Sequence, residues 1–228
     1  MTDRIRVTVE IGPKGKKVVA VAPDWPGLER GAKSGEEAVE KLRFYLPRYA
    51  QVAKLADMSA EFEPLQQVDV VEQVPGTGST DFWGISFAFS SIDKQGLSGD
   101  ELEREVTLMQ ACWALFDDVR RRVSAEMQKG LRGGGRDRDH IVRHTFAAEQ
   151  NWARMIGVLT PDDAMLTDEG LNAHRQGYCQ AIRDYHAQGK LAGKMAKWPL
   201  RFLIRHTAFH TLDHAWEMED KDLTAKVM

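Results

Sequence analysis

The chain has 228 residues, of which 43% are hydrophobic and 29% charged. This length and composition allow one large domain or two smaller ones with buried cores, and they exclude a disordered chain. The formal net charge of −3 provides no overall positive field, which argues against nonspecific binding to nucleic acid or to anionic membranes.

The first 75 residues have the pattern of a small α/β unit. In chain order we expect a strand at 4–10, a turn at 13–15, a second strand at 17–22, a loop at 23–31, a helix starting at 34–37 and a strand within 62–74. Pro47 interrupts the helical spacing, so a kink is expected there. The predicted unit is therefore β-β-α-β over residues 1–75.

The segment at 76–94 separates this unit from the rest of the chain. It begins with glycine, threonine and serine, a composition typical of linkers. Residues 82–91 alternate in polarity, so an edge strand returning to the first sheet is the alternative. We place the domain boundary in this segment.

Residues 95–228 show helical periodicity with clear start and stop signals. We expect one helix from Ser98 to about Lys129, a second from Asp137 or Asp139 to about Gly157, a third from Thr167 to Gly189 and a fourth from about Pro199. Four helices with short connections favour an antiparallel bundle, which builds its metal sites from facing helices. The predicted fold class is α+β, a small N-terminal unit followed by a four-helix bundle.

Five of the seven histidines lie at helical spacing in two of these segments, as His140 and His144 and as His206, His210 and His214. Histidines four residues apart share a helix face, so two can bind one ion, and a third from another helix completes a tripod with an open position. His206 and His214 are separated by about 12 Å along the axis, so the pair is 206/210 or 210/214.

A carboxylate accompanies these histidines. Glu217 follows His214 by three residues and can support that histidine, act as a fourth ligand or serve as a general base. His174 and His186 have no partner at helical spacing, and we expect them at the surface. The alternative for the whole set is that the histidines are ordinary polar residues of a bundle without metal.

Two segments resemble the DinB-like metal-binding four-helix bundles. Residues 205–221, Arg-His-Thr-Ala-Phe-His-Thr-Leu-Asp-His-Ala-Trp-Glu-Met-Glu-Asp-Lys, resemble the last helix of that family, and residues 144–152 resemble the second. In the family, one histidine of the second helix and an H-x-x-x-H pair of the last bind a divalent ion, usually zinc or nickel. The resemblance thus implies His144, His210 and His214 as ligands.

Two further histidines, His140 and His206, lie outside that family pattern, and either can replace a neighbour in the ligand set. The N-terminal unit resembles HicB-type antitoxin domains at residues 23–28 and 32–38. That second resemblance implies a partner-binding role. No separate basic segment for DNA binding follows the unit, so nucleic acid is not an expected partner.

The DinB-like resemblance implies a thiol-dependent S-transferase or isomerase, with a low-molecular-weight thiol bound at the metal and an electrophilic substrate. Glu217 or His206 would then be the catalytic group that moves protons. Two alternatives stay open: a binding or regulatory protein with a structural metal and a HicB-like partner-binding domain, and a metal-dependent hydrolase. Such bundles often pair, so a homodimer is compatible with the resemblance.

Features of the sequence also bear on its location. The N-terminus has no apolar core of signal-peptide length, and no stretch reaches the roughly 20 apolar residues of a membrane span. Cys112 and Cys179 are isolated in predicted helices, which favours packed free thiols. We therefore expect a cytoplasmic protein.

Overall fold

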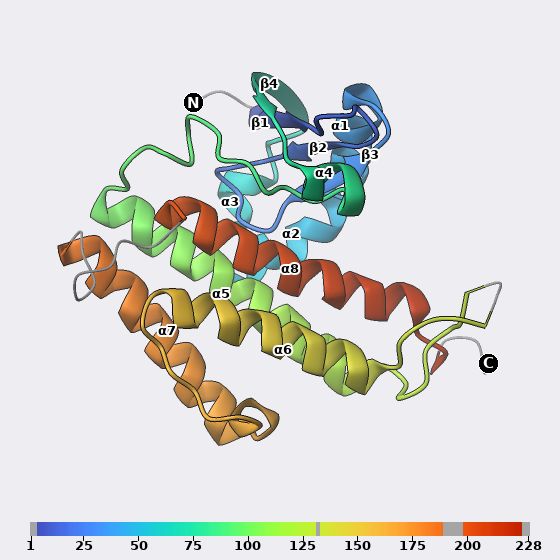
Figure 1. Ribbon diagram of the computed structural model, residues 1–228, viewed down its shortest axis with the longest axis vertical. Coiled ribbons are helices and arrows are strands. Elements are labelled where there is room, and N and C mark those ends of the chain that lie inside the picture. Colours follow the sequence, from blue (N-terminus) through green and yellow to red (C-terminus); the bar gives the residue numbers. More distant parts are fainter. Residues whose placement is uncertain (1–3, 131–132, 189–197, 225–228) are drawn as a thin grey trace.

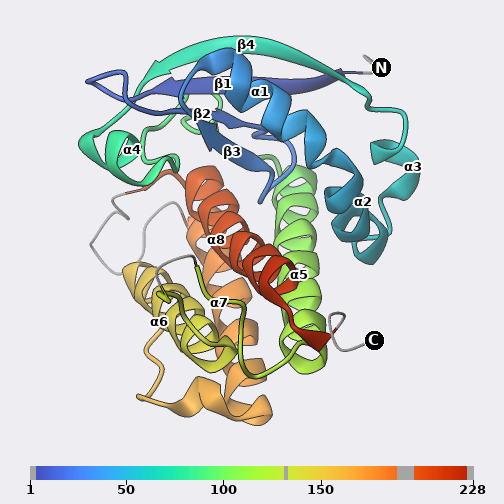
Figure 2. The ribbon, with the colours of Figure 1, turned by 90° about the vertical axis from the view of Figure 1, so that its right-hand side faces the viewer.

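The computed structural model describes residues 4–130, 133–188 and 198–224. The fold is α+β, as predicted: a four-stranded mixed sheet near the N-terminus precedes a helical region. Figures 1 and 2 show the sheet and its short helices at one end of the bundle of long helices.

The N-terminal sheet has the order β3-β2-β1-β4, with β1 antiparallel to β2 and parallel to β4. Its strands are β1 (Arg4–Ile11), β2 (Val18–Val21), β3 (Glu29–Ala32) and β4 (Gln67–Pro75). Four helices belong to this part among the described residues: α1 (Gly35–Phe44), α2 (Leu46–Leu55), α3 (Ser59–Phe62) and α4 (Gly78–Trp83). Ile5, Val7 and Val9 of β1 are buried, so alternate residues of the central strand supply the core beneath the sheet.

Two details of the predicted N-terminal unit are wrong. The loop expected at 23–31 ends in β3, which pairs antiparallel with β2. Glu29 and Arg30 of this strand are polar yet buried, so its sequence lacks an apolar alternation. The expected kink at Pro47 is a complete break between α1 and α2, because proline in a first helical turn needs no hydrogen-bond acceptor.

The segment at 76–94 contains a helix and no strand, so the alternative of a returning strand is wrong. It contains α4, which starts with a capping box formed by Thr77 and Thr80, and residues 82–91 form no strand. The buried carboxylate of Glu10 on β1 accepts hydrogen bonds from Thr80, from Ser86 and from the backbone of residues 87 and 88. A carboxylate of the first strand therefore holds this segment against the sheet.

The four long helices are confirmed as α5 (Gly99–Arg122), α6 (Arg138–Met155), α7 (Asp168–Gln188) and α8 (Leu200–Lys221), with a 3-10 turn at Ala164–Leu166. The first one ends at Arg122 and not near Lys129, because Val123 is extended and Met127 pairs with Asp222. The end predicted for the third helix, Gly189, lies outside the described residues.

The core runs without interruption from the sheet into the bundle. Most residues of α8 are buried, because α5 and α6 cover it from the bundle side and the N-terminal part covers it from the other. Gly27, with a φ of +96°, brings the loop before β3 so close that an added Cβ would lie 3.2 Å from both Cys112 of α5 and Leu212 of α8. This loop is thus seated on the α5–α8 pair.

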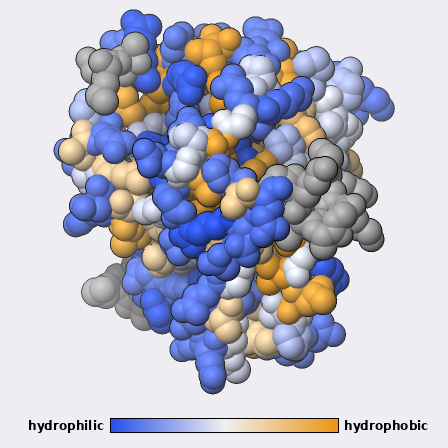
Figure 3. Space-filling view, turned by 90° about the vertical axis from the view of Figure 1, so that its left-hand side faces the viewer, coloured by the Kyte–Doolittle hydropathy of each residue, from blue (hydrophilic) through white to orange (hydrophobic). Residues whose placement is uncertain are grey.

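The surface of the molecule carries both hydrophilic and hydrophobic residues. On the face shown in Figure 3, hydrophilic residues predominate and hydrophobic ones form separate small patches. Among the described helices, none combines the length and apolar character needed to cross a bilayer.

Candidate metal centre

Local sequence places histidines on the facing sides of α6 and α8. Helix α6 starts at Asp137, whose carboxylate accepts a hydrogen bond from the backbone of His140. Ile141 and Thr145 of α6 are buried, whereas His144, which directly precedes Thr145, is exposed. On α8, the apolar residues Phe202, Phe209, Leu212 and Trp216 are buried. The histidines beside these residues face α6.

The structure brings His144, His210 and His214 together. Each offers one ring nitrogen, and these nitrogen atoms all lie within 4.8 Å of one another. The Nε2 atoms of His144 and His210 are 3.2 Å apart. Two nitrogens bound to one tetrahedral zinc at the usual bond length are about 3.4 Å apart, so this separation fits one divalent ion. His140 and His206 are not members of this group.

Glu217 orients the most buried histidine of the group. Its Oε2 lies 2.7 Å from Nδ1 of His214, and the carboxylate also accepts hydrogen bonds from Lys221 at 2.6 Å and from Arg136 at 2.8 Å. If Nδ1 of His214 donates to Glu217, its Nε2 carries the lone pair that a metal ion would bind. This placement favours Glu217 as a support for His214 over a role as a fourth ligand or a general base.

The electrostatics of Glu217 agree with that role. Burial opposes its ionisation, but the hydrogen bonds from His214 and Lys221 outweigh burial and lower its pKa to about 2. A carboxylate with so low a pKa is a poor proton acceptor near neutral pH. Its value to the cluster is that of a fixed negative charge beside an imidazole.

The imidazoles of His210 and His144 are kept neutral. Burial, followed by the proximity of His214 and His144, lowers the pKa of His210 well below its usual value. Burial and the charge of His214 also lower the pKa of His144. Since a metal ion binds only the neutral ring, few protons compete for the nitrogens of His210 and His144 at neutral pH. His144 is exposed, so the cluster opens to solvent on the α6 side.

The structure places His206, the other predicted catalytic group, in an aromatic environment one turn before His210. It is 1% exposed and stacks on Phe202, with Trp152 and Trp198 edge-on to its ring. Burial, and then the charge of Arg205, lower its pKa to about 3. Its Nδ1 has no hydrogen-bond partner in the described chain. His206 is therefore poorly suited to exchange protons near pH 7.

The remaining histidines and the cysteines are outside the centre. His174 is 3% exposed, so its predicted surface position is wrong; its Nδ1 lies 2.6 Å from Thr160 Oγ1. His186 is half-buried and contacts the carbonyl oxygen of Leu97. Cys112 and Cys179 are free and buried, as expected, and burial raises the pKa of Cys179 to about 11.

Two residues beside the cluster were not predicted from the sequence. The ring of Trp152 lies 5.1 Å from that of His210, centroid to centroid, and forms an apolar wall. Trp152 follows His144 by eight residues on one helix, so the helical spacing of the sequence could have placed it on the same side as His144. Arg136 comes from a glycine-rich loop without periodicity, so only the folded structure shows it next to Glu217.

The geometry provides three histidine donors, a carboxylate that orients one of them and a solvent-facing side. Comparisons of the chain with protein-family models, with curated proteins and with solved structures found no match.

Proposed function

We propose that this protein binds one divalent metal ion, zinc or nickel, through His144, His210 and His214, and that it is a thiol-dependent transferase. The convergence of three histidine nitrogens from α6 and α8 is the observation that supports the proposal. Three imidazoles are the donor set of metal sites that keep a position for a substrate or water. The reaction class comes from the DinB-like resemblance of the sequence.

The surroundings of the cluster support an open site. In the described part of the chain, no fourth histidine, cysteine or carboxylate joins the three. Glu217, the nearest carboxylate, is engaged by His214, Arg136 and Lys221. A divalent ion bound here would favour the thiolate over the thiol of a small thiol ligand. Trp152 would exclude water on one side of that ligand.

Metal analysis of untagged protein tests the first half of the proposal. Wild-type protein should contain about one equivalent of zinc or nickel, whereas His144→Ala, His210→Ala and His214→Ala should contain markedly less. His140→Ala is the matched control, since His140 lies on the same helix one turn away and outside the cluster. Absence of metal from wild type, even after reconstitution, would refute the site.

An activity assay tests the second half of the proposal, which is the thiol-dependent transferase reaction. Metal-loaded protein is incubated with a low-molecular-weight thiol and an activated aryl halide; the thiolate sulfur forms a bond to the ring carbon and halide leaves. Release of halide should require the metal and fall to background in His144→Ala. Metal binding without turnover over a panel of thiols and electrophiles would favour the binding protein with a structural metal.

We also propose a cytoplasmic location, because both cysteines are unpaired thiols in the core. Cell fractionation checks this, and recovery from an oxidising compartment would contradict it.

A further inference from the structure

A second candidate site lies where the sheet and α1 meet α8. It is a cavity of about 350 Å³, within the size range of small-ligand sites. Phe209 and Asp213 of α8 line it, but none of the three clustered histidines does. Each of these two residues precedes a histidine of the cluster and points about 100° away from it around the helix. The cavity and the metal centre therefore use different faces of α8.

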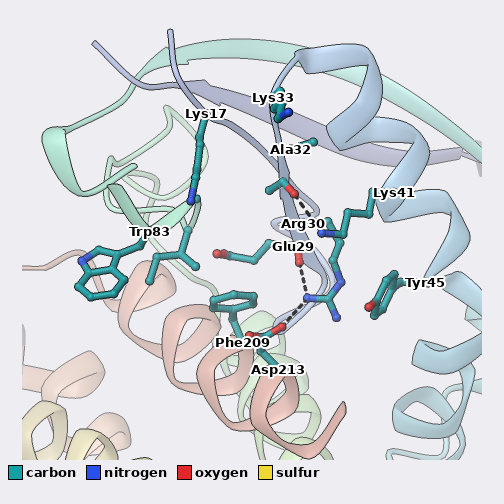
Figure 4. Close-up of a pocket in the computed structure, with 13 residues that line it drawn as sticks. Lys17, Glu29, Arg30, Ala32, Lys33, Lys41, Tyr45, Trp83, Phe209 and Asp213 are labelled. Carbon is teal, nitrogen blue, oxygen red and sulfur yellow. Dashed lines mark hydrogen bonds and ion pairs between the residues drawn. The ribbon is translucent and has the colours of Figure 1, made fainter. Parts of the chain in front are cut away.

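Positive charge surrounds this cavity. Lys17, Lys33 and Lys41 line it, and within the described ranges none of their ammonium groups forms a salt bridge. Lys17 and Lys41 donate only to the backbone carbonyl oxygens of residues 82 and 31. Figure 4 shows Lys17 extending into the space between Trp83 and the strand β3. Three ammonium groups without carboxylate partners favour an anion.

Arg30 adds a buried charge at the floor of the cavity. Its side chain is 4% exposed, and its Nη1 donates to Asp213 Oδ1 at 3.0 Å and to the carbonyl oxygen of residue 29. Its Nε and Nη2 have no hydrogen-bond partner among the described residues. In Figure 4 the guanidinium lies between Asp213 and Tyr45. A buried guanidinium with unused donors is costly, and a carboxylate or phosphate would satisfy it.

The carboxylates of the cavity do not balance these cations. Glu29 accepts hydrogen bonds from Arg205 and from the backbone of Ser86. Among the described residues, Asp213 is the sole carboxylate that forms an ion pair with Arg30, and its side chain is 48% exposed, so it can turn towards solvent. An anion entering the cavity would then take its place on Nη1 of Arg30.

Aromatic rings complete the lining. Trp83 is 63% exposed at the rim, Tyr45 stacks on the guanidinium of Arg30 at 3.7 Å, and Phe209 forms part of the wall on α8. An exposed indole beside a cationic cavity suits a ligand that carries an aromatic ring next to its negative charge.

We propose that this cavity binds a small organic anion, a phosphate or carboxylate attached to an aromatic ring, with Arg30 and Lys33 contacting the anionic group and Trp83 contacting the ring. The N-terminal part and α8 each contribute essential groups, so the site exists only in the assembled molecule. It is independent of the metal proposed for the histidines.

Titration of the full-length protein with phenyl phosphate, followed by ligand-observed NMR, tests the site. The protein is first treated with a chelator, and His144→Ala is titrated in parallel, because phosphate also binds metals. Binding should be the same in both proteins. Benzoate identifies whether carboxylate serves as well as phosphate. Phenol carries no charge, and binding of phenol as tight as that of phenyl phosphate would overturn the proposal.

Single substitutions test which side chains of the cavity bind the ligand. Lys33→Glu should weaken phenyl phosphate at least about tenfold, and Lys54→Glu, an exposed reversal on α2 away from the cavity, by less than about twofold. Asp213→Asn should strengthen binding severalfold, because it removes the competing carboxylate. Trp83→Ala should weaken phenyl phosphate but leave inorganic phosphate unchanged. Equal affinity across these variants, or no binding at millimolar concentrations, would overturn the assignment.

Discussion

At the scale of single residues, the histidine cluster depends on a carboxylate outside it. Glu217 contacts Nδ1 of His214, and Arg136 and Lys221 hold the carboxylate in place. A histidine whose second nitrogen is engaged in this way presents a defined tautomer and a fixed ring orientation to a metal. The affinity of the cluster should therefore respond to a change that leaves all three histidines intact.

The first prediction concerns this carboxylate. Glu217→Gln keeps the size of the side chain but removes its charge, so the affinity for zinc should fall by about 10- to 100-fold. Competition with a chromophoric chelator measures it. Glu219→Gln is the control, because Glu219 lies on the same helix and pairs with Arg48 and Arg122 instead. Equal zinc affinity of the Glu217→Gln variant and wild type would show that Glu217 does not support the site.

The second prediction concerns His206 and pH. Burial, with a contribution from Arg205, lowers the pKa of His206 from 6.5 to about 3 in the folded protein. Between these two pH values the unfolded chain binds a proton that the folded chain does not. The contribution of His206 to the free energy of unfolding is therefore fully present above pH 6.5 and is lost as the pH falls. His206→Phe fills the aromatic pocket without titrating. Between pH 7 and pH 5, the free energy of unfolding of the wild type should fall by about 2 kcal/mol more than that of this variant.

Urea unfolding of chelator-treated protein at the two pH values measures this difference. His140→Ala, an exposed change on α6, should keep the wild-type pH dependence. Identical pH dependence in wild type and His206→Phe would mean that His206 titrates normally.

At the scale of elements, α8 carries both candidate sites because it is covered on several sides. Its Arg205 is fully buried and contacts Asp93 at 2.6 Å and Glu29 at 3.2 Å. The guanidinium also donates to Ser86. One side chain of α8 thus joins β3 to the irregular segment that follows α4, and it fixes the position of the helix against the sheet.

The third prediction follows from this network. Arg205→Met removes the cation and leaves Asp93 and Glu29 buried without it, so the free energy of unfolding should fall by about 3–5 kcal/mol. Denaturant unfolding measures the loss. Arg183→Met removes an exposed pair with Glu103 and should cost at most about 1 kcal/mol. A loss for Arg205→Met no larger than that of this control would contradict the structural role.

At the scale of the whole molecule, the N-terminal part and the bundle share one core. Trp25 and Leu28 of the N-terminal part belong to the same buried cluster as Leu108 of α5 and Leu212 of α8. The cavity that we assign to an organic anion is itself formed by both parts. Separation of the two would expose apolar surface and leave the buried charges of α8 without partners.

The fourth prediction is that the full chain unfolds in a single transition. Circular dichroism at 222 nm and tryptophan fluorescence should give coincident denaturation curves. Residues 1–94 and 95–228, produced separately, should show no cooperative unfolding. Two resolved transitions, or a cooperative bundle fragment, would show that the parts are independent domains.

Sequence alone determined the elements whose signals are local. The N-cap serines Ser34 and Ser98, together with the spacing of apolar residues, located the starts of α1 and α5, because a cap and a periodic face need only neighbouring residues. The same spacing put His210 and His214 on one face of α8. It could not exclude His206, whose distance from His210 along the chain is the same.

Tertiary structure decided everything that depends on residues far apart in the chain. β3 has a polar sequence; it pairs with β2, and Arg205, 176 residues after Glu29, donates a hydrogen bond to the buried carboxyl group of Glu29. The selection of His144 as the third member of the cluster depends on how α6 packs against α8. The cavity around Arg30 arises from the seating of the sheet on α8. Such pairings are set by burial and charge in three dimensions, which local periodicity does not encode.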